Sequence, residues 1–449
     1  MLWALVAVSG LFAMTAEAAD VSFSGFGTLG YAQSNQPYNY ERFINNKGTF
    51  ARDSVAGVQA DIKFTDQLGA TIQGKIAPSL NNDSTWAGTL SWAFVSWRPS
   101  DDWLIRVGKQ RDPFYLYSES LDVGETYDFA RLPTEMYSLV PNSDYTGASI
   151  SKTWNPDLGE LTLDGYAGSS RSAWRFYIRD NTQIQGSTMQ PGANFENFNM
   201  TDVGLALNLL RDEDRYRVSF HKIKATADPG QFFVAYDTLI QPSNIGLVNP
   251  QLAPLSFAFN GSTYTALSSA NVNEADNILF TLGTEIKLPK DFRFIGEFGR
   301  RKVSNIVTGA DTNAGYVSLL KDIDAWTPYF SYAAMKSRSD VISLYQSIGN
   351  SPGLSVSPAG ALAGQTNTVN AVAGPLNASK RLLADGLVAY DQYTIALGTS
   401  YRLTPTQKIK FEWARTHVGV VSSFVDAPSG GSVSNQNIDV LSLSYNFAF

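Results

Sequence analysis

The sequence predicts an all-β protein: a transmembrane antiparallel β-barrel of sixteen strands, with short turns at one end and long loops at the other. Three observations predict this fold. Apolar and polar residues alternate on both sides of short turns, and the connections between these hairpins are long. After residue 20, no apolar run approaches the roughly 18 residues that a membrane helix needs. A chain that crosses a membrane without helices must form a closed barrel.

The N-terminus has the pattern of a cleavable signal peptide, which we assign to residues 1–18. Leu2 to Met14 are almost wholly apolar, and Ala16-Glu17-Ala18 is the small-x-small pattern of a cleavage site. No Lys or Arg precedes the apolar stretch, so either the α-amino group acts alone or the true start lies upstream. The alternative is a buried N-terminal helix. We expect residues 19–449 to form a single barrel domain.

The repeating unit is a hairpin around a short turn that is acidic or contains proline. In the first hairpin, apolar and polar residues alternate over 56–64 and 68–75, on either side of Thr65-Asp66-Gln67. Such period-two alternation predicts paired strands with one apolar face. Seven turns of this kind join fourteen strands, and strands near 21–33 and 438–449 make sixteen. The six further turns lie near 99–102, 155–159, 211–214, 289–291, 322–324 and 404–406.

The remaining connections are longer and more variable. Short turns at one end and long loops at the other are typical of outer-membrane barrels, in which the turns are periplasmic and the loops extracellular. Aromatic residues such as Trp97, Trp103 and Trp326 lie where strands meet the short turns, and predict a girdle at the periplasmic interface. The long loops run approximately over 34–53, 78–89, 110–144, 169–197, 226–276, 302–313, 337–390 and 417–436.

Composition argues against several classes of function. The net charge is −7 without a basic block, which argues against a nucleic-acid partner. The chain has no Cys, so disulfides, thiolate metal sites and thiol nucleophiles are excluded. The chain has only two His residues, His221 and His417, which are too few for a typical zinc site without Cys. No nucleophile motif surrounds a Ser that could act with His221. The sequence predicts neither an enzyme nor a cofactor.

The last strand carries the most specific pattern, because its apolar residues share one face and end in a C-terminal Phe. Here, and in Phe23-Ser24-Gly25-Phe26-Gly27, the chain resembles the sixteen-stranded porins of Gram-negative outer membranes. The resemblance covers the whole mature chain in architecture. It implies a homotrimer in the outer membrane, in contact with lipid and lipopolysaccharide. It also implies an assembly signal, read by the barrel-assembly machinery, in Tyr445, Phe447 and Phe449.

Polar residues that alternate with the lipid-facing positions are expected to line a lumen. Sixteen strands enclose enough space for water, which can hydrate charged side chains in the lumen and so avoid the cost of burying unpaired charges. The alternative is that these residues only solvate the wall. The basic residues predicted to line the pore are Lys75, Arg106, Arg217, Arg293, Lys408 and Lys410.

The connection 110–144 is distinctive because it carries seven acidic residues against Arg111 and Arg131, a net charge of −5. In the porins that the chain resembles, the loop at this place folds into the barrel and narrows it. We expect the aromatic residues of the loop to pack on the wall and its carboxylates to face the lumen, opposite Lys75 and Arg106. Such an arrangement would give a transverse field and a weak to moderate cation preference. The predicted constriction residues are Asp112, Glu119, Asp122, Glu125 and Asp128.

An alternative for this acidic loop is an extracellular position, where it would bind divalent ions together with lipopolysaccharide. For the whole chain, the sequence predicts a water-filled channel for passive diffusion of small hydrophilic solutes and ions. Two further alternatives stay open. One is a porin selective for sugars, carboxylates or inorganic anions, which should show a ladder of inward basic residues. The other is a non-conducting adhesin or receptor barrel that acts through loops 226–276 and 337–390.

Overall fold

The computed structural model describes residues 19–449 except for 142, 185–186, 232, 235–238, 241–265, 268–270, 307–308, 310 and 351–383. The predicted signal peptide and large parts of the loops 226–276 and 337–390 lie outside the described residues.

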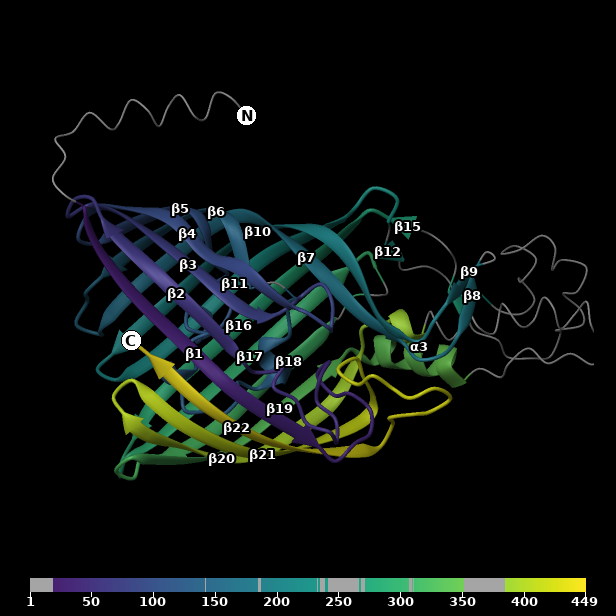
Figure 1. The fold of residues 1–449 in the computed structure, drawn as a ribbon. Coiled ribbons are helices and arrows are strands. Elements are labelled where there is room, and N and C mark those ends of the chain that lie inside the picture. The colour runs from purple at the N-terminus through teal and green to yellow at the C-terminus, as the bar shows by residue number, and fades with distance from the viewer. Residues whose placement is uncertain are drawn as a thin grey trace, which may run out of the picture.

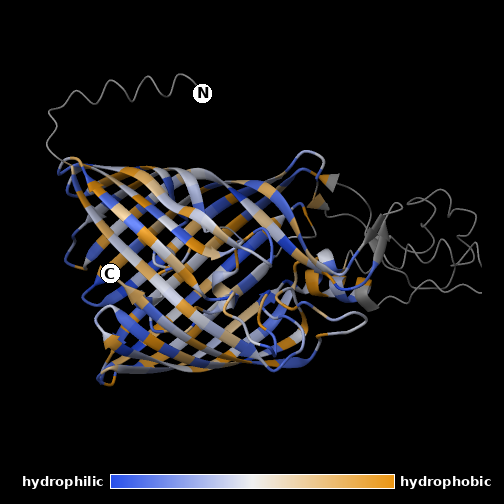
Figure 2. Cartoon of the chain, in the orientation of Figure 1, coloured by the Kyte–Doolittle hydropathy of each residue, from blue (hydrophilic) through white to orange (hydrophobic). Residues whose placement is uncertain are grey.

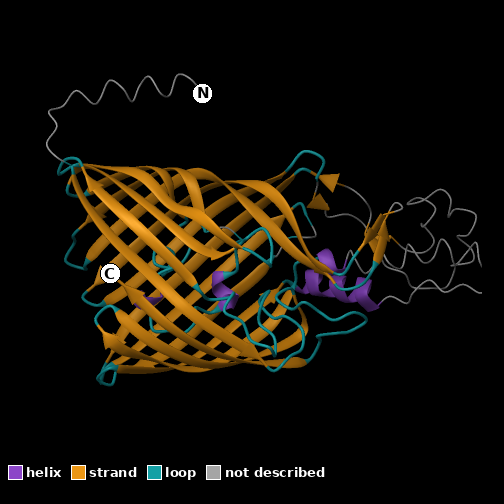
Figure 3. Ribbon diagram, viewed as in Figure 1, coloured by secondary structure: helices purple, strands orange, loops and turns teal. Residues whose placement is uncertain are grey.

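Sixteen antiparallel strands form a closed barrel, which confirms the predicted fold class (Figures 1 and 3). Each strand pairs with the next along the barrel, and the last pairs with the first. The barrel strands are β1 (Asp20–Ser34), β2 (Val55–Lys63), β3 (Leu68–Pro78), β4 (Trp86–Ser100), β5 (Trp103–Arg111), β6 (Asp144–Trp154), β7 (Glu160–Ile178), β10 (Gly192–Arg211), β11 (Asp214–Ala227), β16 (Glu274–Leu288), β17 (Phe292–Ser304), β18 (Thr312–Lys321), β19 (Trp326–Ser337), β20 (Tyr390–Thr404), β21 (Gln407–Ser422) and β22 (Gln436–Ala448).

The remaining elements are short and belong to the loops. None of the helices in the described part of the chain has the length and apolar character needed to span a bilayer. These elements are the hairpin strands β8 (Thr182–Ile184), β9 (Ser187–Met189), β12 (Phe233–Val234), β13 (Leu239–Ile240), β14 (Ala266–Leu267) and β15 (Asn271–Val272), and the helices η1 (Gly124–Thr126), α1 (Thr134–Tyr137) and α3 (Ser339–Asn350).

Hydrophobic and hydrophilic residues alternate along the strands (Figure 2), and many of the large hydrophobic side chains of the strands are exposed. Val58, Leu205 and Leu443, from three different strands, are each more than half exposed. Soluble monomers rarely expose a continuous apolar belt, whereas lipid requires one. At the short-turn end, Trp326 is 50% exposed and its ring lies 4.5 Å from that of Tyr401, as expected at a membrane–water interface.

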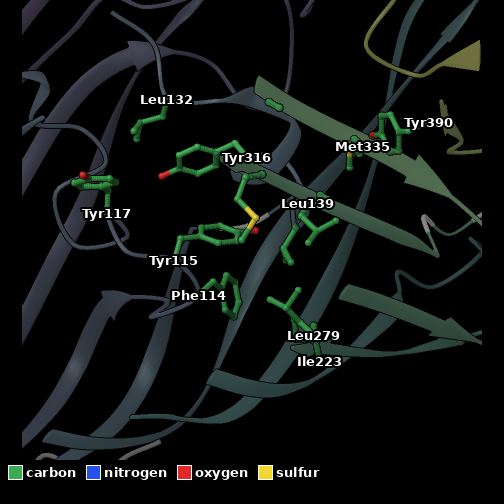
Figure 4. Packing of buried hydrophobic residues seen from close by; sticks show 14 of the residues in the cluster. Phe114, Tyr115, Tyr117, Leu132, Leu139, Ile223, Leu279, Tyr316, Met335 and Tyr390 are labelled. Carbon is green, nitrogen blue, oxygen red and sulfur yellow. The ribbon is translucent and has the colours of Figure 1, made fainter. Parts of the chain in front are cut away.

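The buried core lies inside the barrel, between its wall and the chain that joins β5 to β6. Phe114, Phe129, Met136 and Leu139 of this chain are at most 1% exposed. Figure 4 shows Phe114 and Leu139 among apolar side chains of the wall. The wall residues of this cluster include Ile223, Leu279, Ile295, Tyr316, Tyr329 and Met335.

The barrel is closed by pairing of its two terminal strands. β22 pairs with β1 from Ala448 opposite Phe26 onward, and the backbone of Phe449 exchanges two 2.9 Å hydrogen bonds with that of Gly25. The Phe449 ring covers Gly25 and the Phe447 ring covers Gly27, so that a Cβ atom at either glycine would overlap a ring. These glycines therefore form two notches on the outer face, filled by the C-terminal aromatic rings.

β7 and β10 continue beyond their neighbours as a two-stranded ribbon (Figure 1). β6 pairs with β7 only as far as Ser169, and β11 pairs with β10 only from Phe198. β7 and β10 themselves stay paired as far as Ile178 and Gly192. We call residues 170–180 and 190–197 the strap.

The strap reaches loops that adjoin other strands of the barrel, two of them on the opposite side from β7 and β10. Arg175 lies 2.7 Å from Asp83, between β3 and β4, and 2.7 Å from Asp426, between β21 and β22. Arg179 lies 2.7 Å from Asp385, just before β20. Sixteen tilted strands about 4.8 Å apart make a barrel roughly 30 Å across, and nine extended residues span about as much. The strap therefore crosses the mouth of the barrel at its long-loop end.

Candidate functional site

The chain between β5 and β6, residues 112–143, is named here the inner loop. Its first residues are fixed to the wall through their backbone carbonyls. Thr281 donates a 2.7 Å hydrogen bond to the carbonyl of Phe114, and Arg217 donates one to the carbonyl of Pro113. Because carbonyls make these contacts, sequence reasoning had no side-chain signal from which to find them.

Asp122 is the first of two carboxylates that fix the middle of the inner loop. It accepts hydrogen bonds of 2.8 Å from Lys75 and forms an ion pair with Arg111. Glu119, three residues earlier, lies 3.6 Å from Arg106 but keeps 70% of its side chain exposed. The structure therefore brings together the predicted residues Lys75 and Asp122 closely, and Arg106 and Glu119 loosely.

Asp128 is the second of these carboxylates. It is paired with Arg293, lies 3.2 Å from Lys408, and accepts a 2.8 Å hydrogen bond from Ser400. Burial would raise the pKa of Asp128, but Lys408 and Arg293 outweigh burial and lower that pKa to about 2. Glu125 lies 3.8 Å from Lys408, a weaker contact.

Lys410 is buried under the inner loop and binds its backbone. Its Nζ donates to the carbonyls of Phe129, at 2.9 Å, and Gly124, and lies 4.1 Å from the ring centroid of Tyr127. All six basic wall residues predicted from the sequence thus contact the inner loop.

The second half of the inner loop carries two anchors that sequence reasoning missed. Arg131 donates a 3.1 Å hydrogen bond to Asp53, at the entrance to β2. Glu135, which is 1% exposed, accepts hydrogen bonds from Gln392, at 2.7 Å, and Thr394. Burial raises the pKa of Glu135. Only the net charge of the segment hinted at such contacts, and it did not identify the partners.

The expectation that the loop carboxylates face the lumen across from basic residues is wrong for most of them. Asp122 and Asp128 face the wall and are paired there, and Asp112 is 2% exposed, with a pKa raised well above its ordinary value by burial. Buried carboxylates are costly unless they are paired, and the wall supplies the partners. Glu119 alone of the five predicted acidic residues is mostly exposed. The paired charges largely cancel, so any transverse field is weaker than the loop charge suggests.

His221 is the one histidine that could have belonged to a hydrolase site with a neighbouring serine. Its Nε2 lies 2.7 Å from Ser219 Oγ, and its Nδ1 lies 3.0 Å from Tyr166 Oη. Both His221 and Ser219 are at most 2% exposed, and the ring of Phe114 lies 4.8 Å from the imidazole. A substrate has no access to this pair, so it belongs to the core. Within the described residues, no three or more possible ligands are grouped as a metal site would require.

The sequence matches no protein family and no curated protein. Comparison with solved structures found similar chains, three of which follow. The trimer form of OmpT, an outer membrane protein of Vibrio cholerae, has a TM-score of 0.50 at 10% identity, over 96% of this chain and 100% of that one. An anion-selective porin of Comamonas acidovorans has a TM-score of 0.48 at 9% identity, over 96% and 100%. The outer membrane channel DcaP of Acinetobacter baumannii has a TM-score of 0.47 at 11% identity, over 97% and 99%.

At such identities the similarity concerns the fold. The chain is a closed sixteen-stranded barrel, and its fold is similar to that of the outer membrane protein OmpT.

Proposed function

We propose that the protein is an outer-membrane porin, a water-filled channel for passive diffusion of small hydrophilic solutes and ions. The observation that carries this proposal is a closed sixteen-stranded barrel with an apolar exterior and charged side chains on its inner wall. A dry interior would not support so many charged groups, whereas a barrel of this size has room for water. The chain is exported by residues 1–18 and assembles as a homotrimer.

Planar-bilayer recording of the purified protein tests this proposal. We expect stepwise conductance in KCl, with reversal potentials in asymmetric KCl that report ion preference. A folded, heat-modifiable barrel that inserts and carries no current would contradict the porin proposal and favour the adhesin or receptor alternative.

We further propose that the inner loop forms the constriction. The support is that Asp122 and Asp128 tie it to opposite parts of the wall, β3 and β5 in one case and β17 and β21 in the other. Ion pairing leaves little net charge on the loop, so we expect a cation preference weaker than its charge of −5 would give alone.

Neutralising the loop tests whether it is the constriction. The variant Asp122→Asn with Glu125→Gln should change single-channel conductance or reversal potential, because it removes the carboxylate that pairs with Lys75 and Arg111 and leaves Lys408 paired with Asp128. The matched control changes Asp66 and Glu213 in the same way, since both lie in short turns and are 94% and 68% exposed. Parent-like conductance in the loop variant would mean that the loop does not form the constriction.

We also propose that Tyr445, Phe447 and Phe449 act in assembly. Phe449 supplies both a ring and two backbone hydrogen bonds to the closing pair of strands. Deleting Phe449 should lower the folded fraction recovered from outer membranes. Phe23→Ala, which removes a ring that is 77% exposed on the neighbouring strand, should leave the yield unchanged. An equal yield from the deletion would remove the argument.

A further inference from the structure

Two lysines on the outer face of the barrel lie in one row across the neighbouring strands β11, β16 and β17 (Figure 1). Lys222 of β11 and Lys302 of β17 are both paired in register with Ile278 of β16, which lies between them. Both lysines are exposed and Ile278 is 37% exposed, whereas their chain neighbours His221 and Leu279 are buried and face inward. We call Lys222, Ile278 and Lys302 the lysine row. Strands lie about 4.8 Å apart, so the two lysine backbones are roughly 10 Å apart, and both side chains can reach one group between them.

The two lysines of this row differ in their pairing from other basic residues at the same end of the face. Lys224 lies 2.6 Å from Glu274, and Arg300 lies 2.5 Å from Asp311. Among the described residues, neither Lys222 nor Lys302 lies within ion-pair distance of a carboxylate.

The rest of the mature sequence cannot supply a carboxylate to each lysine. Beyond residue 18, the residues that the structure leaves undescribed include one acidic residue, Asp237. Two like charges close to an apolar surface repel one another unless an anion lies between them. The lysine row therefore favours an anionic ligand.

The row lies where the apolar part of the outer face ends. The next outward positions toward the long loops are polar, at Lys224, Asp276 and Ser304. The next outward positions in the other direction include Phe220 and Phe280, which are paired in register. Lysines at such a boundary lay their stems along apolar surface and extend their charged ends to the level of the lipid headgroups. Because the row lies at the long-loop end of the strands, these are headgroups of the outer leaflet.

An apolar hollow of about 560 Å³ lies on the same strands, nearer the short turns. Its lining includes Val218, Leu282 and Phe298, each four residues from the lysine row along its own strand. Leu282 and Phe298 are each 43% exposed, so the hollow opens outward. Gly296 also belongs to the lining and contributes no side chain. The volume is within the range of sites that hold drug-sized ligands.

The distance from the row to the hollow suits a lipid chain. Four residues span about 13 Å along a strand, and about 10 Å along the membrane normal when the strand is tilted by about 40°. One leaflet of the hydrocarbon core is roughly 15 Å thick. An acyl chain whose headgroup lies at the lysine row therefore passes over the hollow.

We propose that the lysine row and the hollow form a binding site for lipopolysaccharide, the phosphorylated lipid of the outer leaflet. Lys222 and Lys302 bind one lipid phosphate over Ile278, and an acyl chain of the same molecule fills the hollow. Each lysine acts on the phosphate as a point charge, and the shared anion removes their mutual repulsion. The site lies across the barrel from the closing pair β1 and β22, and it does not depend on whether the channel conducts.

Diphosphoryl lipid A is the probe that tests this site. Native mass spectrometry of the mature protein in non-ionic detergent, over a range of lipid concentrations, gives the dissociation constant. Dephosphorylated lipid A should bind at least tenfold more weakly, because it lacks the charge, and phosphatidylglycerol roughly tenfold more weakly, because its single phosphate carries fewer chains. Inorganic phosphate at the same concentration should not displace the lipid, because it has no chain.

Substitutions in and beside the lysine row have effects of opposite sign. Lys222→Gln with Lys302→Gln should weaken lipid A binding roughly tenfold to thirtyfold. Lys63→Gln with Lys287→Gln removes the same charge at the short-turn end, where the side chains are 60% and 51% exposed, and should leave binding unchanged. Asp276→Asn removes a negative charge from the next outward position, and should tighten binding, which general damage to the site would not do.

A larger side chain in the hollow tests the acyl chain separately from the phosphate. Val218→Trp should fill the hollow and weaken lipid A binding roughly tenfold while leaving both lysines in place. Val58→Trp is the matched control, because Val58 is 64% exposed on β2, away from the hollow. Heat-modifiable migration on gels shows that each variant is folded.

The outcomes decide the proposal. Lipid A binding that is unchanged in the Lys222→Gln, Lys302→Gln variant, or equally weakened in the Lys63→Gln, Lys287→Gln control, overturns the site. Displacement by inorganic phosphate would assign the row to a free anion, and equal binding of phosphatidylglycerol would assign it to anionic lipid in general, and either result overturns the assignment to lipopolysaccharide. Loss of binding with normal KCl current overturns this site alone, whereas normal binding without current overturns only the porin.

Discussion

The inner loop and the strap both cross the space enclosed by the barrel, one inside it and one over its mouth, but they are held differently. The inner loop buries Phe129, Met136 and Leu139 almost completely, in addition to its ion pairs. In the strap Ile178 is 1% exposed, but the side chains of residues 173–177 are only partly buried. The best-defined contacts of the strap are the ion pairs of Arg175 and Arg179 with loops on the far side.

The difference indicates two kinds of attachment. Burial of apolar side chains inside the barrel resists salt and is lost only when the segment leaves the wall as a unit. The ion pairs at the mouth hold the strap through only a few side chains. Arg175 and Arg179 are 13% and 8% exposed, so salt screens these pairs only in part. We therefore expect the inner loop to act as a fixed part of the channel and the strap to be releasable.

The largest effect should come from removing the apolar anchor of the inner loop. The ring of Phe129 lies 5.2 Å from that of Tyr329, and Phe129→Ala should weaken loop docking by about 3–5 kcal/mol. We expect higher, noisier single-channel conductance, and tryptic cleavage after Arg131 in the folded barrel. Phe330→Ala, on the lipid face and 47% exposed in the wild type, should show neither change. If the Phe129→Ala variant keeps the conductance and current noise of the parent and resists trypsin, ion pairs alone fix the loop.

A smaller effect is expected from releasing the strap. Arg175→Gln removes hydrogen bonds of 2.8 Å to Asp83 and of 2.7 and 2.8 Å to Asp426, a loss on the order of 2 kcal/mol. In single-channel recordings the variant should spend more time in a state of higher conductance. Arg171→Gln is the matched control, because Arg171 is 57% exposed and pairs locally with Asp228. Identical gating in both variants would show that the strap does not limit current.

The smallest effect concerns acid. The pKa of Asp128 lies at about 2, below its ordinary value of 3.8, so its carboxylate stabilises the docked loop at every pH above about 4. That contribution, roughly 2 kcal/mol, is lost as the pH falls through about 2. Single-channel conductance should thus be constant from pH 7 to about 4 and change only below, and Asp128→Asn should remove this acid step. A change already near pH 6 would assign the acid sensitivity to another group.

The strands could be predicted because alternation is local. The first hairpin was expected over 56–64 and 68–75, and the structure has Val55–Lys63 and Leu68–Pro78. In β4, residues 92–97 are apolar on both faces, so alternation alone does not indicate which face is inward. The structure gives two reasons for this pattern. The register of β4 shifts opposite Gln73 and Gly74, and Trp92 and Phe94 line a cavity inside the barrel.

The strap and the ion-pair partners could not be predicted in this way. Residues 169–197 were expected to be a loop, because a ribbon that leaves the barrel has no lipid face to impose alternation. Lys75 was expected to be inward, but its pairing with Asp122 depends on the path of the loop across the lumen. Residues 47 positions apart carry no sign in their spacing that they meet.

Gly25 and Gly27, where the first and last strands pair, couple the two ends of the sequence. Gly25 and Gly27 leave the space that Phe449 and Phe447 occupy, so neither pair can change freely. A larger residue at position 25 would displace the last ring, and a smaller residue at position 449 would leave an unfilled gap. We expect these positions to covary among homologues, with bulk gained in the first strand matched by bulk lost in the last. Where the first and last strands pair, selection therefore acts on the combined size of two side chains that are distant in sequence, rather than on the size of either one.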